Sequence, residues 1–279
     1  MELIGVDICP KPTAGLCNQL YSIIAMCRLI YFQKKKFVFI GRFLKSINTN
    51  NYCNISDIID IQKTNVFLNK YNLVLIDVHN CEYNIDMNNI KLIPNFSYEQ
   101  DAMFIDLLQN IIFKKEFINK ANQFMISNYY YTKLGELENS NKPINCIHLR
   151  LEDDAINCWS SEINLSPDIF KQIAEDKYIE LIKKHFNKND IILLLSSNYN
   201  NKVVKFLNEN NYNYIITKKF YEERELSAIV DLHISTYCNN KYIFIFESSF
   251  SFSILRRLKQ VKMGIMITYN KIFLSLIHI

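Results

Sequence analysis

The segment from Asn145 to Asp154 concentrates the side chains of this chain that could do chemistry. An apolar run gives way there to one imidazole, one guanidinium and three carboxylates. Residues 144–149 alternate as a short buried strand would, which puts His148 and Arg150 on the same side of the strand's end. Open α/β sheets bind ligands outside the carboxyl ends of their strands, and the planar fork of Arg suits phosphate. The segment predicts either a phosphate clamp or a strand-end salt bridge between Arg150 and Glu152 or Asp153.

A second candidate lies between the first strand and the first long helix, at Thr13-Ala14-Gly15-Leu16-Cys17-Asn18-Gln19-Leu20. Glycine allows a tight turn that presents the amides at a helix N-terminus to an anion or a sugar. The segment lacks the glycine spacing of a dinucleotide fingerprint and the Gly-Lys-Ser/Thr ending of a phosphate loop. An ordinary helix-start turn is the alternative interpretation.

A third candidate is the serine-rich segment Phe246–Ser253, where a strand turns into a helix. One serine suffices to cap a helix, but this turn supplies Ser248, Ser249 and Ser251. Hydroxyls and unpaired amides at a helix N-terminus also form a phosphate site, so the excess of serines favours ligand binding.

Asp231 lies on the helix before that strand. A carboxylate near a strand-end crevice can accept the ring and exocyclic N–H groups of a guanine, although a solvated helix carboxylate is the commoner situation. We assign no role to the histidines outside the first segment. No catalytic triad spacing, His-Glu-x-x-His motif or Asp-rich metal loop is present, and Arg150 opposes a cation at Glu152-Asp153-Asp154, so we expect no metal.

Regular alternation of strands and helices positions these candidates in the second half of the chain. Ser166 and Pro167 mark the start of one predicted helix. The predicted strands are 144–149, 190–195, 213–216, 242–246 and 263–267, and the helices are 168–186, 200–210, 223–235 and 250–259. This pattern predicts parallel β-α-β units.

The first half has a looser version of the same pattern, with strands at 1–8, 37–40 and 72–77 and helices at 16–33, 98–113 and 116–131. The polar stretch 135–143 is the best candidate linker. We therefore predict two Rossmann-like α/β domains that face each other across a cleft, at residues 1–138 and 139–279.

Composition narrows the function classes. The chain has 279 residues, a net charge of +4 and 49% hydrophobic residues, which is typical of a globular protein and disfavours a nucleic-acid partner. None of the eight cysteines forms a Cys-x-x-Cys pair, so we expect reduced thiols. The apolar stretch 20–32 is too short to span a bilayer, and the chain opens without a secretory signal pattern. We expect a cytoplasmic protein without an integral membrane segment.

The three motifs, in their order and spacing, resemble those of the GDP-fucose-dependent fucosyltransferases, the group that contains the α1,2-, α1,6- and protein O-fucosyltransferases. That family has a Gly-x-x-x-Gln turn after the first strand, a His-x-Arg signature with acids after it, and a helix Asp followed by a serine-rich turn. The matching segments are Gly15-Leu16-Cys17-Asn18-Gln19, His148-Leu149-Arg150-Leu151-Glu152-Asp153-Asp154, and Asp231 with Ser248-Ser249-Phe250-Ser251.

The resemblance implies a GT-B type fold and an inverting, metal-independent transferase with no cofactor besides its donor substrate, GDP-fucose. Arg150 would hold the β-phosphate and stabilise the departing diphosphate, Asp231 would read guanine, and Asn18 would face the sugar. The implied catalytic residues are Arg150, Asn18 and Asp153, and the implied substrate-binding residues are Gly15, Leu16, His148, Glu152, Asp154, Asp231, Ser248, Ser249, Phe250 and Ser251.

The chain departs from the family at two places. The α1,6 enzymes carry a Glu eight residues after the Arg, where this chain has Cys158, so that general base does not carry over; Glu152, Asp153 and Asp154 are the candidates. Ser197 and Asn198 stand where relatives often have acids that help to hold the nucleotide. The alternatives are the same fold with another nucleotide sugar, or a nucleotide- or glycan-binding protein without catalysis. The acceptor, a glycan or a protein, cannot be read from these motifs.

Overall fold

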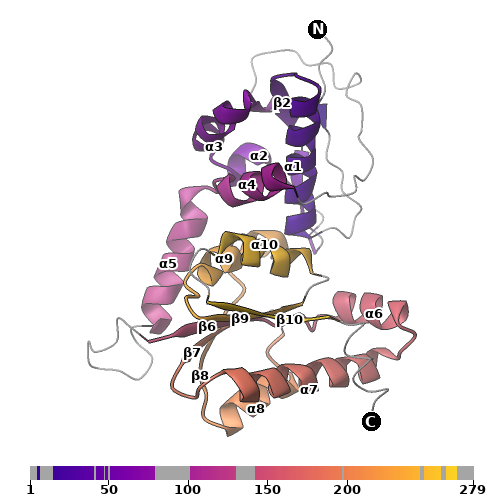
Figure 1. The fold of residues 1–279 in the computed structure, drawn as a ribbon, viewed down its shortest axis with the longest axis vertical. Helices are drawn as coiled ribbons and strands as arrows, with labels where there is room; N and C mark the ends of the chain where they lie inside the picture. The colour runs from indigo at the N-terminus through magenta and orange to yellow at the C-terminus, as the bar shows by residue number, and fades with distance from the viewer. Residues whose placement is uncertain are drawn as a thin grey trace. The chain divides into compact units, whose positions relative to one another are not determined.

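A computed structural model gives the fold in two compact units (Figure 1). Unit 1 comprises Met1–Ala121 with Phe220–Val230, and unit 2 comprises Asn122–Lys219 with Asp231–Ile279. The boundary predicted at residue 138 lies outside the described residues. The structure describes residues 5–6, 15–40, 42–46, 48–49, 51–78, 101–129, 142–196, 198–245, 248–258 and 262–268.

Unit 1 is built on a three-stranded parallel sheet in the order β1-β2-β5. Its strands are β1 (Gly5–Val6), β2 (Phe37–Ile40) and β5 (Val74–Asp77), and its main helices are α1 (Leu16–Phe32), α3 (Ile61–Leu68) and α4 (Ala102–Asn110). Most residues of α1 are buried. The helix therefore carries apolar residues on more than one face. Helix α5 (Lys115–Tyr129) begins in unit 1 and ends in unit 2.

Unit 1 also contains short elements that the periodicity did not predict. An antiparallel pair, β3 (Arg42–Lys45) and β4 (Tyr52–Asn54), leads into the single-turn α2 (Ile55–Ile58), and the 3-10 helix η1 (Asn69–Tyr71) follows α3. Such elements are too short to show a hydrophobic period.

Unit 2 contains a five-stranded parallel sheet in the order β10-β9-β6-β7-β8. The strands are β6 (Ile144–His148), β7 (Ile191–Leu195), β8 (Asn213–Ile216), β9 (Lys241–Ile245) and β10 (Met263–Ile267). Numbered from β6, this order is 3-2-1-4-5, the Rossmann order. All residues of β6 and β7 are buried, as expected for a parallel sheet that is covered on both faces.

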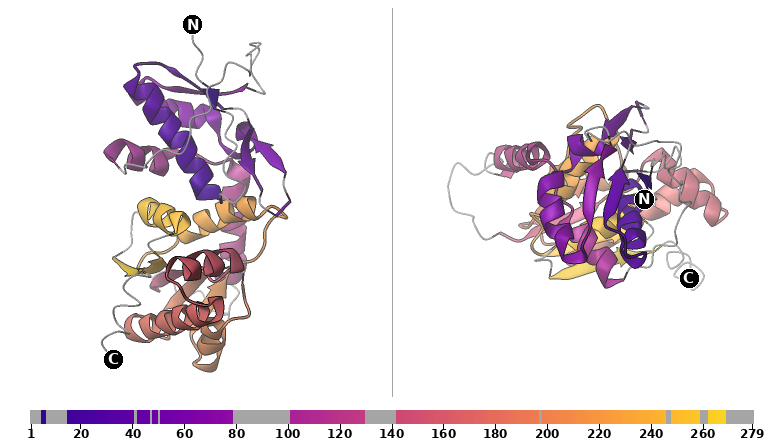
Figure 2. Two further views of the ribbon diagram at one scale, coloured as in Figure 1. Left: turned by 90° about the vertical axis from the view of Figure 1, so that its right-hand side faces the viewer. Right: turned by 90° about the horizontal axis from the view of Figure 1, so that it is seen from above.

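Helices cover both faces of this sheet. They are α6 (Asp153–Glu162), α7 (Pro167–His185), α8 (Lys202–Glu209), α10 (Ser249–Arg257) and α9 (Arg224–Ser235), which begins in unit 1 and ends in unit 2. Helices α7 and α8 lie on one face and α9 and α10 on the other (Figures 1 and 2). The core between the sheet and α7 includes Ile147, Tyr178 and Leu194, each without exposed surface.

Local sequence explains where these helices begin. Ser166 caps α7 by accepting a hydrogen bond from the amide of Ile169 at 3.3 Å, and Pro167 occupies the first helical position, as predicted. Helix α6, which the sequence did not predict, begins with Asp153 and Asp154 and packs on α7 through residues such as Ile156. No helix in the part of the chain that the structure describes is long and apolar enough to cross a membrane.

Candidate functional site

The centre of the unit 2 sheet contains the point where its winding reverses. Strands β6 and β9 are adjacent and parallel, with Cys146 beside Tyr242 and Ile147 beside Ile243. The chain leaves β6 toward α6 and α7, whereas it leaves β9 toward α10 on the other face. Such a reversal opens a crevice at the carboxyl ends of the two strands, where doubly wound domains bind ligands. Two of the predicted motifs follow these two strand ends.

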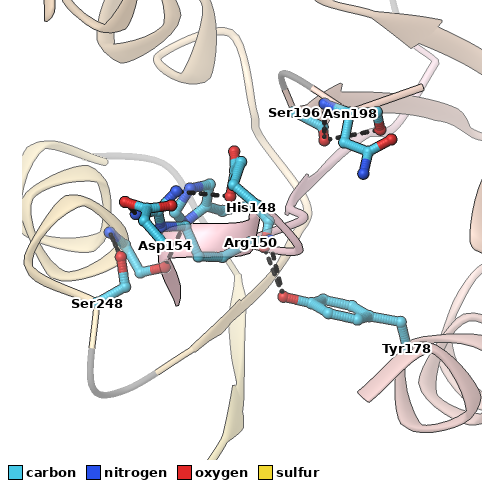
Figure 3. Close-up of polar contacts among 9 residues, drawn as sticks. His148, Arg150, Asp154, Tyr178, Ser196, Asn198 and Ser248 are labelled. Carbon is cyan, nitrogen blue, oxygen red and sulfur yellow. Dashed lines mark hydrogen bonds and ion pairs between the residues drawn. The ribbon is translucent and has the colours of Figure 1, made fainter. Parts of the chain in front are cut away.

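Arg150 lies just after β6 and is held by two acids at the start of α6, of which Figure 3 labels Asp154. Its Nη1 donates to Glu152 Oε2 at 2.6 Å, and its Nη2 donates to Asp154 Oδ2 at 2.8 Å. Its side chain is 16% exposed. Burial lowers the pKa of Arg150, but the two carboxylates outweigh that effect and the pKa lies above its ordinary value.

Arg150 can therefore form the salt bridges and bind a phosphate at the same time. A guanidinium carries five N–H donors, and the two acids accept from one donor on each terminal nitrogen. Glu152 is the N-cap of α6 and Asp154 is in its first turn, where the helix dipole favours negative charge. The acids thus fix the orientation of a cation that has further donors for an anion.

His148 ends β6 and is tied to the start of α10. Its Nδ1 lies 2.6 Å from the Oγ of Ser251, whose side chain is fully buried. The Oγ of Ser248 caps α10 by accepting from the amide of Ser251 at 3.3 Å. The ring of Phe250 lies against that of His148, with centroids 4.9 Å apart. This arrangement joins the first and third motifs directly.

The start of α10 has the general features of an anion site. An α-helix leaves its first amides without partners inside the helix, and the Ser248 cap accepts from the amide of Ser251. Ser249 is half-buried in the first turn, with its carbonyl accepting from the hydroxyl of Ser253. Phe246 and Glu247, which precede this turn, lie outside the described residues.

Tyr178 of α7 is a supporting residue that the motifs did not predict. Its hydroxyl donates to the carbonyl of His148 at 2.8 Å and accepts from the amide of Arg150 at 3.4 Å (Figure 3). It therefore fixes the backbone at the point where β6 stops pairing. The sequence gives no local signal for this, because Tyr178 occupies an ordinary core position of an amphipathic helix.

Asp231 of α9 is half-buried as a residue, but its Oδ1 is inaccessible to solvent and has no hydrogen-bond partner among the described residues. Burial raises the pKa of Asp231 well above its ordinary range, against the lowering effect of a hydrogen bond with Thr217, and Glu152 raises it further. A buried carboxylate oxygen without a donor is costly, and each such group needs an explanation.

Asp153 and Asn198 are two further residues of unit 2 that the sequence analysis singled out. Asp153 is exposed in the first turn of α6. Asn198 follows β7, and its amide donates to Ser196 Oγ at 3.1 Å (Figure 3). No cluster of acids, histidines and cysteines within the described ranges could hold a metal ion.

Unit 1 carries the second motif at the start of α1. Gly15 is the N-cap, with a φ of −67° that any residue adopts, and a Cβ there would meet nothing within 4 Å among the described residues. The side chain of Leu16 is buried, whereas Asn18 is exposed and its carbonyl accepts from Ser22 at 3.1 Å. Neither backbone strain nor packing explains the glycine.

Comparison with solved structures gives the fold a wider context. POFUT1 in complex with GDP matches with a TM-score of 0.61 at 10% sequence identity, over 94% of this chain and 97% of that chain. POFUT1 in complex with GDP-fucose matches with a TM-score of 0.60 at 9% identity, over 95% and 97%. NodZ α-1,6-fucosyltransferase co-crystallised with GDP matches with a TM-score of 0.56 at 11% identity, over 88% and 90%. A further NodZ structure that matches is from Bradyrhizobium.

This chain has the fold of these fucosyltransferases. The predicted GT-B type α/β fold is thereby confirmed, and so is the resemblance in fold that the motifs indicated. No model of a protein family and no curated protein matches the sequence. At about a tenth of positions identical, the likeness concerns the fold, and the activity has to be argued from the site.

Proposed function

We propose that the protein is an inverting, metal-independent glycosyltransferase that moves fucose from GDP-fucose to a hydroxyl of a glycan or a protein. The observation that carries the proposal is the convergence of His148, Arg150 and the Ser248–Ser251 turn at the switch point of a Rossmann-ordered sheet. The fold is that of structures that hold GDP and GDP-fucose.

Arg150 is the residue proposed to act on the leaving group. Inversion breaks the bond between the anomeric carbon and the β-phosphate oxygen as the acceptor oxygen bonds from the opposite face. The acceptor hydroxyl gives up its proton to a base in this step, and exposed Asp153 is the candidate base, since Glu152 and Asp154 are engaged with Arg150. Negative charge then grows on the diphosphate, and a preoriented guanidinium stabilises it. Glu152 and Asp154 hold Arg150 in place, and the hydroxyl and amide groups at the start of α10 add donors to the phosphates.

Asp231 is proposed to recognise the guanine base. Guanine presents a ring N–H and an exocyclic amino group side by side, and a carboxylate accepts from both. The Oδ1 that lacks a partner among the described residues supports this role, and because this oxygen is inaccessible to solvent, guanine would reach it only after the side chains that cover it move.

A non-catalytic nucleotide- or glycan-binding protein is the second candidate. It is favoured by Cys158, which lies exposed on α6 at the position where the α1,6 enzymes carry a Glu. A different nucleotide sugar is a third option within the same fold. The acceptor and the cytoplasmic location expected from the sequence stay predictions.

Thermal shift and turnover test the proposal together. GDP should raise the melting temperature of the protein more than UDP does, and the protein should release GDP from GDP-fucose in the presence of EDTA. Arg150→Ala should lower turnover by about 100-fold or more, since one preorganised donor to a developing anion has that effect. Lys202→Ala is the matched control, because Lys202 forms an exposed ion pair with Asp176 in the same unit.

The outcomes separate the candidates. GDP binding without any release of GDP from GDP-fucose would support the non-catalytic protein, and a stronger response to GDP-mannose would favour another donor. Unchanged turnover in a folded Arg150→Ala variant would contradict the mechanism.

A further inference from the structure

The end of α1 carries an exposed cluster of aromatic rings that the proposed function does not use. Phe32 is 64% exposed and Tyr31 is 42% exposed. Their rings meet edge to face with centroids 5.5 Å apart, and Tyr31 meets Tyr71 in the same way at 5.8 Å. Tyr71 in turn contacts Phe67 at 6.1 Å. The four rings thus form a continuous chain across α1, α3 and η1.

Four lysines lie near these rings in the sequence. Lys34, Lys35 and Lys36 follow Gln33, the C-cap of the helix, and the first and last of them are exposed. Lys70 Nζ lies 4.1 Å from the ring centroid of Phe67 and also pairs with Asp106. We call residues 31–36 together with Phe67, Lys70 and Tyr71 the aromatic–lysine patch. It lies within unit 1.

The backbone at Lys34 shows that the fold itself does not favour a lysine there. Lys34 has a φ of 55°, and its amide donates to Tyr31 while that of Lys35 donates to Ile30, both at 2.9 Å. These two bonds are the Schellman motif that ends a helix, and its left-handed position is usually occupied by Gly or Asn. The helix dipole favours nearby cations, but it does not explain two exposed aromatic side chains.

We propose that the aromatic–lysine patch lies against an anionic membrane surface. Tyr31 and Phe32 would enter the headgroup region, where aromatic side chains are favoured, while the lysines would approach acidic headgroups. The charge of the patch and the exposure of its rings match this partner, which requires no membrane-spanning segment. The inference does not depend on the proposed enzymatic activity.

Co-sedimentation with lipid vesicles tests the inference. The full chain should bind vesicles of phosphatidylcholine mixed with phosphatidylglycerol, bind pure phosphatidylcholine much less, and dissociate as salt rises. Lys34→Asn should weaken binding about five-fold, the contribution of one lysine near an anionic surface. The same change should raise the melting temperature, because Asn tolerates the left-handed conformation better, so misfolding cannot explain the loss.

Matched variants complete the experiment. Phe32→Ser should also weaken binding, whereas Lys205→Asn and Ile169→Ser, which change an exposed lysine of α8 and an exposed isoleucine of α7, should leave it unchanged. Equal binding by Phe32→Ser and the wild type would overturn the inference. So would absence of binding to anionic vesicles, or a wild-type dimer that Phe32→Ser converts to a monomer, since the patch would then bind a second copy.

Discussion

The unpartnered oxygen of Asp231 links ligand binding to protonation and stability. Its raised pKa means that the folded protein holds the Asp231 proton more tightly than the unfolded chain does. That contribution to stability is complete below the unfolded pKa of about 3.9, and it is lost as pH rises through the folded pKa. The folded protein at higher pH therefore carries the cost of a buried charge.

Asp231→Asn should remove this cost. Above the folded pKa of Asp231 the variant should unfold at a higher temperature than the wild type, and at low pH the two should converge. Asp176→Asn, the same change at an exposed carboxylate, should lack this pH-dependent gain. Melting curves between pH 3 and pH 9 measure both effects.

Asp231→Asn should also weaken the binding of GDP. The wild type should bind GDP more tightly as pH rises through the Asp231 pKa, because the charged form accepts both guanine donors. Asp231→Asn should bind GDP roughly 10-fold or more weakly, without that rise, since hydrogen bonds to a charged group contribute about 1.5–3 kcal/mol. Calorimetric titration at several pH values checks this, and equal affinity in both proteins would exclude the guanine role.

Gly15 offers a test in unit 1. Gly15→Ser fits the observed φ, its Cβ would meet nothing within 4 Å among the described residues, and its hydroxyl could cap the helix, so stability should rise by about 0.5–1 kcal/mol. If the glycine leaves room for the sugar, turnover of GDP-fucose should fall while the melting temperature rises. Unchanged turnover in the stabilised variant would make Gly15 an ordinary helix start.

At the scale of elements, two helices of unit 2 provide a matched pair of caps. Ser248 caps α10 and Ser166 caps α7, and each hydroxyl accepts from the amide three residues later at 3.3 Å. Ser248→Ala and Ser166→Ala should each lower the free energy of unfolding by about 1 kcal/mol. Only Ser248→Ala should also reduce the GDP-induced thermal shift. Equal GDP shifts in the two variants would remove the start of α10 from the site.

The sequence predicts most of the unit 2 elements because their patterns are unambiguous. The run Ile191–Leu195 is continuously apolar, as a doubly covered strand must be, and α7 starts at a Ser-Pro cap. Helix α6 was missed because it is short and mostly polar, with Ala155, Ile156 and Ser160 as its buried residues. Tyr178 was missed because its role comes from a contact between distant segments, which periodicity does not encode.

The residues of the site also fall into those that the sequence predicted and those that it did not. The sequence predicted that the His148 and Ser251 motifs share a site, but it did not predict the contact between these two side chains, which lie 103 positions apart in the chain. A salt bridge from Arg150 to Glu152 or Asp153 was one of two predicted alternatives. The structure has the pair with Glu152, and its second pair is with Asp154, one residue beyond the predicted Asp153. The unpartnered oxygen of Asp231 depends on burial, which the sequence of a helix face does not determine.

At the scale of the whole molecule, the chain combines a Rossmann-ordered unit that carries the proposed donor residues with a second parallel α/β unit that carries the Gly15 turn. Under the proposed function, unit 2 would bind the nucleotide. The aromatic–lysine patch of unit 1 adds a surface that is separate in sequence from every proposed donor contact.

Hydrogen–deuterium exchange of the full chain with and without GDP tests the central claim most directly, because it reports where the nucleotide binds. GDP should slow exchange in residues 148–154 and 248–251, and UDP should do so much less. Protection that is absent from both segments, or equal protection by GDP and UDP, would contradict the assignment of a guanine nucleotide to the switch point of unit 2.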